Sequence, residues 1–147
     1  MREIEFRGHE SPLFAGEKKK KKPKWLYGSL RNVSEEHPQI AEPPMGLWCN
    51  VEPETVGQYT GMKDKDGVKI YEGDVVDVVP ILGIHFRGVV KFNSHTCAFD
   101  VFREERGDSA CLKDDFSVEV RGNVFDDPVL KKRYGDIYFM EITKDGF

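Results

Sequence analysis

The stretch ETVGQYTGMKDKDGVKIYEGDVVDV, residues 54–78, holds two turns followed by the start of an extended apolar segment. In the first turn, residues 63–67, Gly67 can adopt a positive φ, and aspartate side chains can accept hydrogen bonds from nearby backbone amides. The second turn, residues 71–74, leads directly into the valine-rich run at residues 75–79. Turns this closely spaced favour short antiparallel strands, so the stretch predicts a β-rich domain.

Alternating segments continue the β pattern after this stretch. Residues 86–92 and 116–121 place apolar side chains at alternate positions, as half-buried antiparallel strands do. Between them, residues 103–115 are too charged for a core and are expected to form an exposed hairpin tip or loop. The turns recur at a spacing of about 8–12 residues, which is typical of a small barrel or sandwich. We therefore expect a mainly β fold.

The C-terminal residues predict one helix and one further strand. Asp127 fits an N-cap and Pro128 fits the first helical position of a short helix over residues 128–134, with basic residues toward its end. Gly135 is expected to end this helix. Residues 137–142 are apolar and aromatic, so they predict a terminal strand.

The N-terminal third lacks long periodic segments because prolines, glycines and a lysine run interrupt it. Ile4 and Phe6 alternate with charged residues, which predicts a short strand with these two side chains on one face. Residues 25–27 can form a second strand. We expect residues 1–50 to form an irregular, β-containing segment with a lysine-rich loop, and residues 51–147 to form the main β domain with its helix and terminal strand.

The composition is that of a folding chain whose charge is unevenly distributed. Hydrophobic residues make up 39% and charged residues 33% of the 147 residues, unlike a disordered chain. There are 22 lysines and arginines against 26 aspartates and glutamates, and six of the lysines lie between Lys18 and Lys24. The remainder has 16 basic against 26 acidic residues and carries a net charge of −10. Such an acidic body argues against a nucleic-acid-binding surface spread over the whole fold.

The lysine run has two interpretations. If it is exposed and mobile, its ammonium groups can contact nucleic-acid phosphates with a strong dependence on salt. It can equally be a solvated loop without a specific partner, since only Trp25 and Tyr27 follow it as nearby aromatic residues. The candidate contacts with nucleic acid are Lys18, Lys19, Lys20, Lys21, Lys22 and Lys24.

Neither a membrane span nor a secretory signal is expected from the sequence. The densest apolar segment, residues 75–86, is interrupted by Asp77, Pro80 and Gly83 and falls short of the roughly 20 residues that a helix needs to cross a bilayer. The N-terminus is charged from its second residue and lacks an apolar signal core. We therefore expect a cytoplasmic protein that does not associate with membranes.

The cysteines and histidines show no spacing typical of a ligand set or a nucleophile. Cys49, Cys97 and Cys111 form no C-x-x-C pair and are expected to be reduced structural thiols, with Cys97 on the inner face of a strand. Among the histidines, His95 is expected in a hairpin turn, and His85 lies among apolar neighbours, where a structural role is commoner than catalysis. The four histidines are His9, His37, His85 and His95.

The sequence contains no catalytic or metal-binding motif that we can identify. The D-x-D-G pattern at residues 64–67 begins like a calcium loop, but Val68, Lys69 and Val75 stand where its later ligands and glycine are needed. The sequence has no G-x-S-x-G, P-loop or G-x-G-x-x-G motif. Adjacent acidic residues point to opposite faces of an extended chain. We therefore expect no enzymatic activity, no metal and no small-molecule cofactor.

Residues 54–78 closely resemble the signature of the YopX family, small proteins found largely in bacteriophages and prophages. Further matches stand in the expected order: MREIEFR at the start, WLYGSL before the signature, and GVVKF and then GNVFDDP after it. The resemblance spans about residues 1–130, while the five consecutive lysines and the tail from Lys131 depart from it. It implies a mostly β protein of the bacterial host cell whose second part is an SH3-type β-barrel. It brings no assigned activity, catalytic residue or cofactor.

The residues of the family motif have a structural explanation. Glycines allow tight turns, the two tyrosines can pack at the edge of a barrel, and the aspartates can cap turns. A binding role is the alternative. The motif residues are Gly57, Gln58, Tyr59, Thr60, Gly61, Asp64, Gly67, Tyr71, Glu72, Gly73 and Asp74.

Functional hypotheses of three classes follow from these features. The first is a non-enzymatic phage or prophage accessory protein, a small β-barrel module that binds a protein or assembles with itself through exposed loops and edge strands. The second is a nucleic-acid-binding module that uses the barrel surface or the arm at residues 18–24. The third, a hydrolase, requires scattered carboxylates to converge in a cleft with a perturbed pKa.

Overall fold

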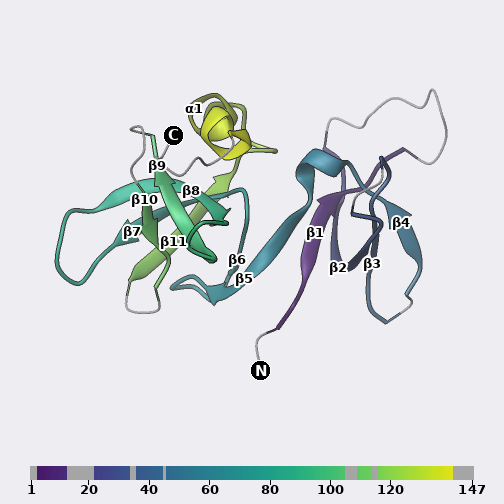
Figure 1. Ribbon diagram of the computed structural model, residues 1–147, viewed down its shortest axis with the longest axis horizontal. Coiled ribbons are helices and arrows are strands. Elements are labelled where there is room, and N and C mark those ends of the chain that lie inside the picture. Colours follow the sequence, from purple (N-terminus) through teal and green to yellow (C-terminus); the bar gives the residue numbers. More distant parts are fainter. Residues whose placement is uncertain are drawn as a thin grey trace. The chain divides into compact units, whose positions relative to one another are not determined.

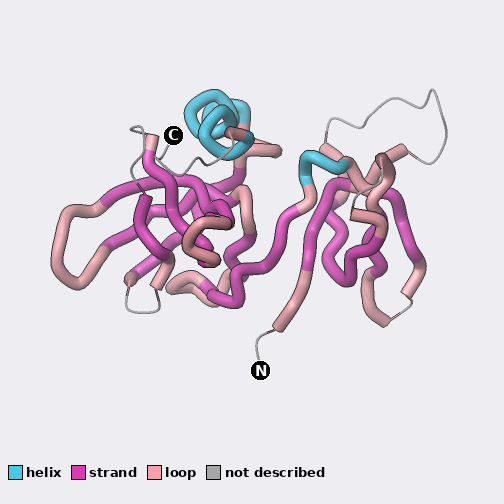
Figure 2. The backbone as a smooth tube through the Cα atoms, viewed as in Figure 1, coloured by secondary structure: helices cyan, strands magenta, loops and turns pink. Residues whose placement is uncertain are grey.

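The computed structural model describes residues 3–12, 22–33, 36–44, 46–104, 109–113 and 116–140. The chain divides into two compact units, residues 1–59 and 60–147, which is a later division than the one expected after residue 50. Strands dominate both units, as Figure 2 shows in magenta. The expectation of a mainly β protein is confirmed.

The first unit is an antiparallel sheet with the strand order β4-β3-β2-β1-β5. The 3-10 helix η1 (Pro53–Thr55) precedes β5, whose first residues pair with β1. The strands expected near the N-terminus and at residues 25–27 are present, and the segment is more regular than the sequence indicates. The strands are β1 (Phe6–His9), β2 (Trp25–Arg31), β3 (Gln39–Ala41), β4 (Trp48–Asn50) and β5 (Gly57–Lys63).

The inner side of the first sheet is apolar. Leu26, Ile40 and Val51 are buried there, and partly buried residues from β1, β2 and β4 pack against them. The expectation for Ile4 is wrong, because the strand begins only at Phe6 and the Ile4 side chain is 68% exposed. On the other face of β1, polar side chains are buried, as described below.

The second unit contains the end of β5, the short strand β6 and a five-stranded antiparallel sheet with the order β10-β9-β8-β7-β11. The single α-helix among the described residues, α1 (Pro128–Phe139), lies beside this sheet (Figure 1). The five-stranded sheet ends at β10 and β11. Its strands and β6 are β6 (Lys69–Tyr71), β7 (Asp74–Val79), β8 (Phe86–Asn93), β9 (Ala98–Arg103), β10 (Ser109–Cys111) and β11 (Ser117–Asn123).

Apolar clusters lie on both faces of the five-stranded sheet, so neighbouring valines of one strand serve different clusters. Val90 of β8 packs with Val76 and Val78 of β7 on one face. Val89 packs with the helix residues Leu130 and Tyr134 on the other face. Helix α1 therefore covers the face of the sheet that carries Val89. The alternation of apolar and polar residues along β8 would by itself predict that this face contacts solvent.

Helix α1 continues past the expected stop at Gly135 and ends at Phe139. The predicted terminal strand is wrong over residues 137–140, because Ile137, Tyr138 and Phe139 lie in the helix and Met140 is its C-cap, while residues 141–142 fall outside the described ranges. A glycine inside a helix costs about 1 kcal/mol relative to alanine, and burial of the following apolar residues offsets that cost. The expected N-cap is confirmed, since the Asp127 side chain accepts from the amides of residues 129 and 130.

Two loop expectations need correction. Cys97 is exposed and has a positive φ of 55° in the β8–β9 turn, because this turn extends one residue beyond Thr96 and displaces the thiol from the strand. His95 does lie in this turn, where its amide donates to Asn93 Oδ1 at 3.0 Å. Within residues 103–115, Ser109–Cys111 form β10 against β9, so the segment is not only an exposed loop. Residues 105–108 and 114–115 lie outside the described ranges.

Candidate functional site

The aspartate of the first motif turn holds backbone amides. Asp64 Oδ1 accepts from the amides of Asp66 and Val68, each at 2.9 Å, and Oδ2 accepts from the amide of Val120 at 3.1 Å. Burial raises the pKa of Asp64, but these three hydrogen bonds outweigh it and leave the pKa below its ordinary value. The carboxylate therefore ties the β5–β6 turn to β11.

The second motif turn is equally tight. The amide of Tyr71 donates to Asp74 Oδ2 at 2.8 Å, and Gly73 adopts a φ of 90°. The amide of Gly73 donates to the carbonyl of Val90 at 2.8 Å. A Cβ at Gly73 would lie 2.5 Å from a ring carbon of Phe125. The turn thus needs a glycine for both its backbone conformation and its packing.

The remaining motif residues occupy strands and turns in the same region. Thr60 Oγ1 donates to the carbonyl of Ile70 at 2.8 Å. Gly61 and Gly67 have positive φ, while Gly57 and Gln58 pair with β1. Tyr59 is buried, as is Tyr71, and Glu72 is half-buried. These contacts support the structural interpretation of the motif.

The lysine run is only partly described. Lys18 to Lys21 lie outside the described residues, while Lys22 and Lys24 are exposed. Lys24 Nζ lies 3.7 Å from Glu42 Oε1. Within the described part of the chain, no group of three or more His, Cys, Asp or Glu is placed to hold a metal ion.

The four histidines do not converge on one site. His9 is buried in β1, whereas His37, His85 and His95 are exposed. Only His85 lines the groove described next.

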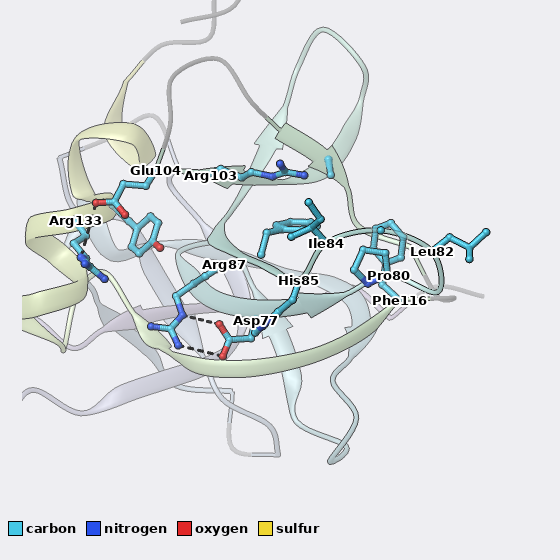
Figure 3. Close-up of a pocket in the computed structure, with 14 residues that line it drawn as sticks. Asp77, Pro80, Leu82, Ile84, His85, Arg87, Arg103, Glu104, Phe116 and Arg133 are labelled. Atoms are coloured by element: carbon cyan, nitrogen blue, oxygen red, sulfur yellow. Dashed lines mark hydrogen bonds and ion pairs between the residues drawn. The ribbon is translucent and has the colours of Figure 1, made fainter.

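A groove of about 880 Å³ opens on the second unit. Its walls come from the end of β7, the β7–β8 loop, β8, β9 and α1 (Figure 3). It is lined by Asp77, Pro80, Leu82, Gly83, Ile84, His85, Phe86, Arg87, Arg103, Glu104, Ala110, Phe116, Arg133 and Tyr134.

The β7–β8 loop gives the groove an apolar rim. Ile81, Leu82 and Ile84 are 75%, 91% and 87% exposed. Figure 3 shows Leu82 pointing away from the strands at the far end of this loop. Single exposed aliphatic residues are common, but several in one short loop mark a candidate contact surface.

An ion-pair network forms one wall of the groove. Arg87 Nε lies 2.6 Å from Asp77 Oδ1, and Arg121 Nε lies 3.2 Å from Asp77 Oδ2. The hydrogen bond from Arg87 lowers the pKa of Asp77, and the same bond raises the pKa of Arg87. The Asp77 carboxylate is therefore committed to two guanidinium groups and is not poised for proton transfer near neutral pH.

Two further arginines line the groove. The guanidinium of Arg103 lies over the Phe86 ring at 4.2 Å, and Arg133 Nε lies 3.8 Å from Glu104 Oε1. Burial raises the pKa of Tyr134, and Glu104 adds to this shift, so the phenol stays protonated at neutral pH. The site combines exposed aliphatic side chains with three arginines, of which Arg87 and Arg133 are paired with Asp77 and Glu104.

The groove is not among the sites expected from the sequence. Its residues are spread from position 77 to position 134, and strand pairing brings them together. One signal was available: the apolar tetrapeptide Ile81-Leu-Gly-Ile84 follows a proline and contains a glycine, as a loop does, although its side chains are aliphatic.

The family model described as YopX protein matches residues 3–131, which is most of the chain. The chain belongs to the YopX family. No curated protein and no solved structure matched it. The YopX match covers both motif turns and the apolar rim of the groove, whereas Arg133 and Tyr134 lie beyond it. Among the described residues of this YopX-family chain, no helix has the length and apolarity to span a bilayer.

Proposed function

We propose that this YopX-family chain is a non-enzymatic accessory protein of phage or prophage origin whose second unit binds a partner protein. The observation that carries this proposal is the exposed aliphatic loop, with Leu82 at 91% exposure, beside an arginine-lined groove. An exposed aliphatic loop of this kind does little to stabilise the fold, because its side chains remain in contact with water after folding. Contact with another molecule accounts for it.

We also propose that the second unit is an SH3-type barrel. The amide of Lys65, in the β5–β6 turn, donates to the carbonyl of Val118 in β11 at 2.8 Å. Ile70 of β6 shares one buried cluster with Val101 of β9 and Val118 of β11. These contacts support strands that wrap around a common interior, as in a small barrel, and barrels of this kind present ligands with their loops.

The groove's charge indicates the chemistry of the partner. Three arginines line it, Arg87, Arg103 and Arg133, against the two carboxylates Asp77 and Glu104. Arginine recognises carboxylates through paired hydrogen bonds, and the loop offers aliphatic contacts. The proposed occupant is therefore a segment of a partner protein in which aliphatic or aromatic side chains alternate with acidic ones.

Selection from a random peptide library on the intact protein tests this proposal. We expect enriched peptides to combine apolar and acidic residues, and to bind a Leu82→Ser/Ile84→Ser variant at least tenfold more weakly. A matched control is Val129→Ser, at an exposed aliphatic residue of α1 outside the groove, which should leave binding unchanged. Enrichment of basic peptides, or equal binding to the loop variant, would overturn the assignment.

Sedimentation velocity separates a foreign partner from a second copy of the chain. A concentration-dependent dimer that disappears in the loop variant would assign the groove to self-association and contradict the acidic-segment proposal. A monomer at all concentrations, together with enriched peptides, supports it.

A further inference from the structure

The first unit carries aromatic and arginine side chains on one face of its sheet. Directly paired residues of antiparallel strands point to the same side. His9 pairs with Trp25, and Arg7 pairs with Tyr27. Ala41 of β3 pairs with both Ser29 of β2 and Trp48 of β4, which places Trp48 on this same side. The opposite side holds the apolar cluster of Leu26 and Ile40, so the aromatic residues are not part of that core.

Guanidinium groups lie against both indole rings on this face. The guanidinium carbon of Arg7 lies 4.5 Å from the centroid of the Trp25 ring, and the His9 ring lies 3.9 Å from the same indole. The guanidinium carbon of Arg31 lies 4.2 Å from the centroid of the Trp48 ring. Each tryptophan ring therefore has a guanidinium group against it.

A ladder of polar side chains fixes Arg31 over Trp48. Arg31 Nε donates to Gln39 Oε1 at 2.8 Å, and Gln39 Nε2 donates to Asn50 Oδ1 at 2.8 Å. These residues come from three neighbouring strands in direct register. The arginine and its aromatic partner are thus positioned before any ligand arrives, which lowers the entropy lost on binding.

The aromatic residues remain accessible. Tyr27 is 36% and Trp48 is 37% exposed, and Trp25 is half-buried. Alternate residues along a strand are about 7 Å apart, and strands two apart in a sheet are separated by about 10 Å. Planar groups in an extended chain can therefore stack on Tyr27 and Trp48, whereas the Trp25 ring is packed against Arg7 and His9.

The accessible positive charge of this face is that of Arg31. Lys24, which precedes β2, is paired with Glu42, and Arg7 is buried, whereas Arg31 is exposed and lies over the Trp48 ring. Stacking platforms combined with basic side chains are how proteins bind single-stranded nucleic acid without reading its sequence.

We propose that the exposed part of this face, formed by Tyr27, Arg31 and Trp48, binds single-stranded nucleic acid, with half-buried Trp25 and buried Arg7 packed beside it. Bases stack on the exposed rings of Tyr27 and Trp48, and phosphates lie near Arg31. A polypeptide partner is less well matched, because exposed planar rings beside a guanidinium group suit stacked bases and phosphates. This site lies on the first unit and is independent of the partner-protein groove.

The two tryptophans of the chain both lie on this face, so tryptophan fluorescence reports on it alone. The test titrates the intact protein with an unmodified oligothymidine of about 20 nucleotides and follows tryptophan emission at low salt and again at physiological salt. We expect saturable quenching that weakens as salt rises. Absence of quenching and of any anisotropy change with a fluorescein-labelled copy, at low salt, would overturn the proposal.

Variants locate the binding surface. Trp48→Ala and Tyr27→Ala should each weaken oligothymidine binding about tenfold or more, since each removes a stacking ring. Phe92→Ala removes an exposed aromatic side chain of the second unit and should leave binding unchanged. Arg31→Lys keeps the charge but removes the planar stack, so it should also weaken binding, and it covers the case in which Trp48→Ala fails to fold.

Two controls separate this site from its alternatives. A variant with serine at residues 18–22 removes the five consecutive lysines. If that variant loses binding while Trp48→Ala and Tyr27→Ala bind like the parent chain, the lysine run is the contact and the face is not. Poly-glutamate of matched charge should quench far less than oligothymidine. Equal quenching would identify a site for acidic polypeptides and would overturn the nucleic-acid assignment.

Discussion

Arg87 donates hydrogen bonds from Nε and Nη2 to the two carboxylate oxygens of Asp77, at 2.6 and 3.2 Å, from directly paired positions on β7 and β8. Arg121 approaches the same carboxylate from β11, and its Nη1 binds Glu119. Glu119 is itself the direct β11 partner of Asp77, so Arg121 bridges two like charges that strand pairing brings together. The wall of the groove is thus a network spanning three strands.

Replacing Asp77 should destabilise the second unit more than replacing an exposed acid. The Asp77 side chain is only 14% exposed, and Asp77→Asn leaves the Arg87 guanidinium without its carboxylate partner and beside Arg121, which keeps only Glu119. We expect a loss of about 1–2 kcal/mol in the free energy of unfolding, measured by urea denaturation. Glu104→Gln is the control, because Glu104 and Arg133 are both more than half exposed and such pairs contribute roughly 0–1 kcal/mol. Equal effects of the two changes would contradict the network's role.

Acid should unfold the chain partly through Asp64 and Asp77. Both have a pKa below the ordinary value in the folded protein. Their stabilisation is therefore complete above the unfolded-state value, near 3.9, and is lost as pH falls through the folded-state pKa values. Urea denaturation at a series of pH values should show stability falling below about pH 4, with a shallower fall in an Asp64→Asn/Asp77→Asn variant. An unchanged pH dependence in that variant would count against both assignments.

Two glycine substitutions separate backbone strain from steric overlap. Gly67 and Gly73 both have positive φ, at 84° and 90°, but only Gly73 has a neighbour where a Cβ would lie, a ring carbon of Phe125 at 2.5 Å. Gly67→Ala should cost about 1–2 kcal/mol from the left-handed backbone alone. Gly73→Ala should cost about 2–4 kcal/mol because overpacking is added. Similar thermal shifts for both variants would show that Phe125 moves aside at little cost.

Local signals predicted the starts of elements better than their ends. Asp127 and Pro128 specify the beginning of α1 by side-chain capping and by a fixed φ, both of which depend on adjacent residues only. The end of the helix depends on a residue far away in sequence. Lys91 of β8 donates to the carbonyls of Ile137 and Met140, a contact that no pattern within the helix reveals.

The same limit applies to the candidate surfaces. The WLY run predicted β2. The alternation of its side chains does not show which face of the strand packs on the apolar cluster, so it could not show that Trp25 lies on the face with Arg7. That arrangement depends on the register of β1 against β2, in which a shift of one residue would exchange the two faces. The groove likewise requires the pairing of β7 with β8 and the packing of α1, so its members were not recognised as a set.

Lys91 should hold the last turn of α1. Its ammonium group meets carbonyls at the C-terminal end of the helix, where positive charge is favoured, although burial lowers the pKa of this lysine. Lys91→Met keeps the apolar stem and removes the hydrogen bonds. We expect faster amide exchange in residues 136–140, with little change at residues 129–132. Uniform exchange changes along the helix would indicate that Lys91 acts through sheet packing instead.

The exposed loop of the groove should be dispensable for folding. Leu82 and Ile84 are 91% and 87% exposed, so replacing them with serine removes side chains that contact water in both the folded and unfolded states. The free energy of unfolding of the Leu82→Ser/Ile84→Ser variant should therefore change by less than about 0.5 kcal/mol. Binding of an apolar dye should fall in the same variant, because the loop contributes exposed aliphatic surface. A loss of stability above about 1 kcal/mol would mean that these side chains pack within the fold, and the loop would then need no partner to explain its composition.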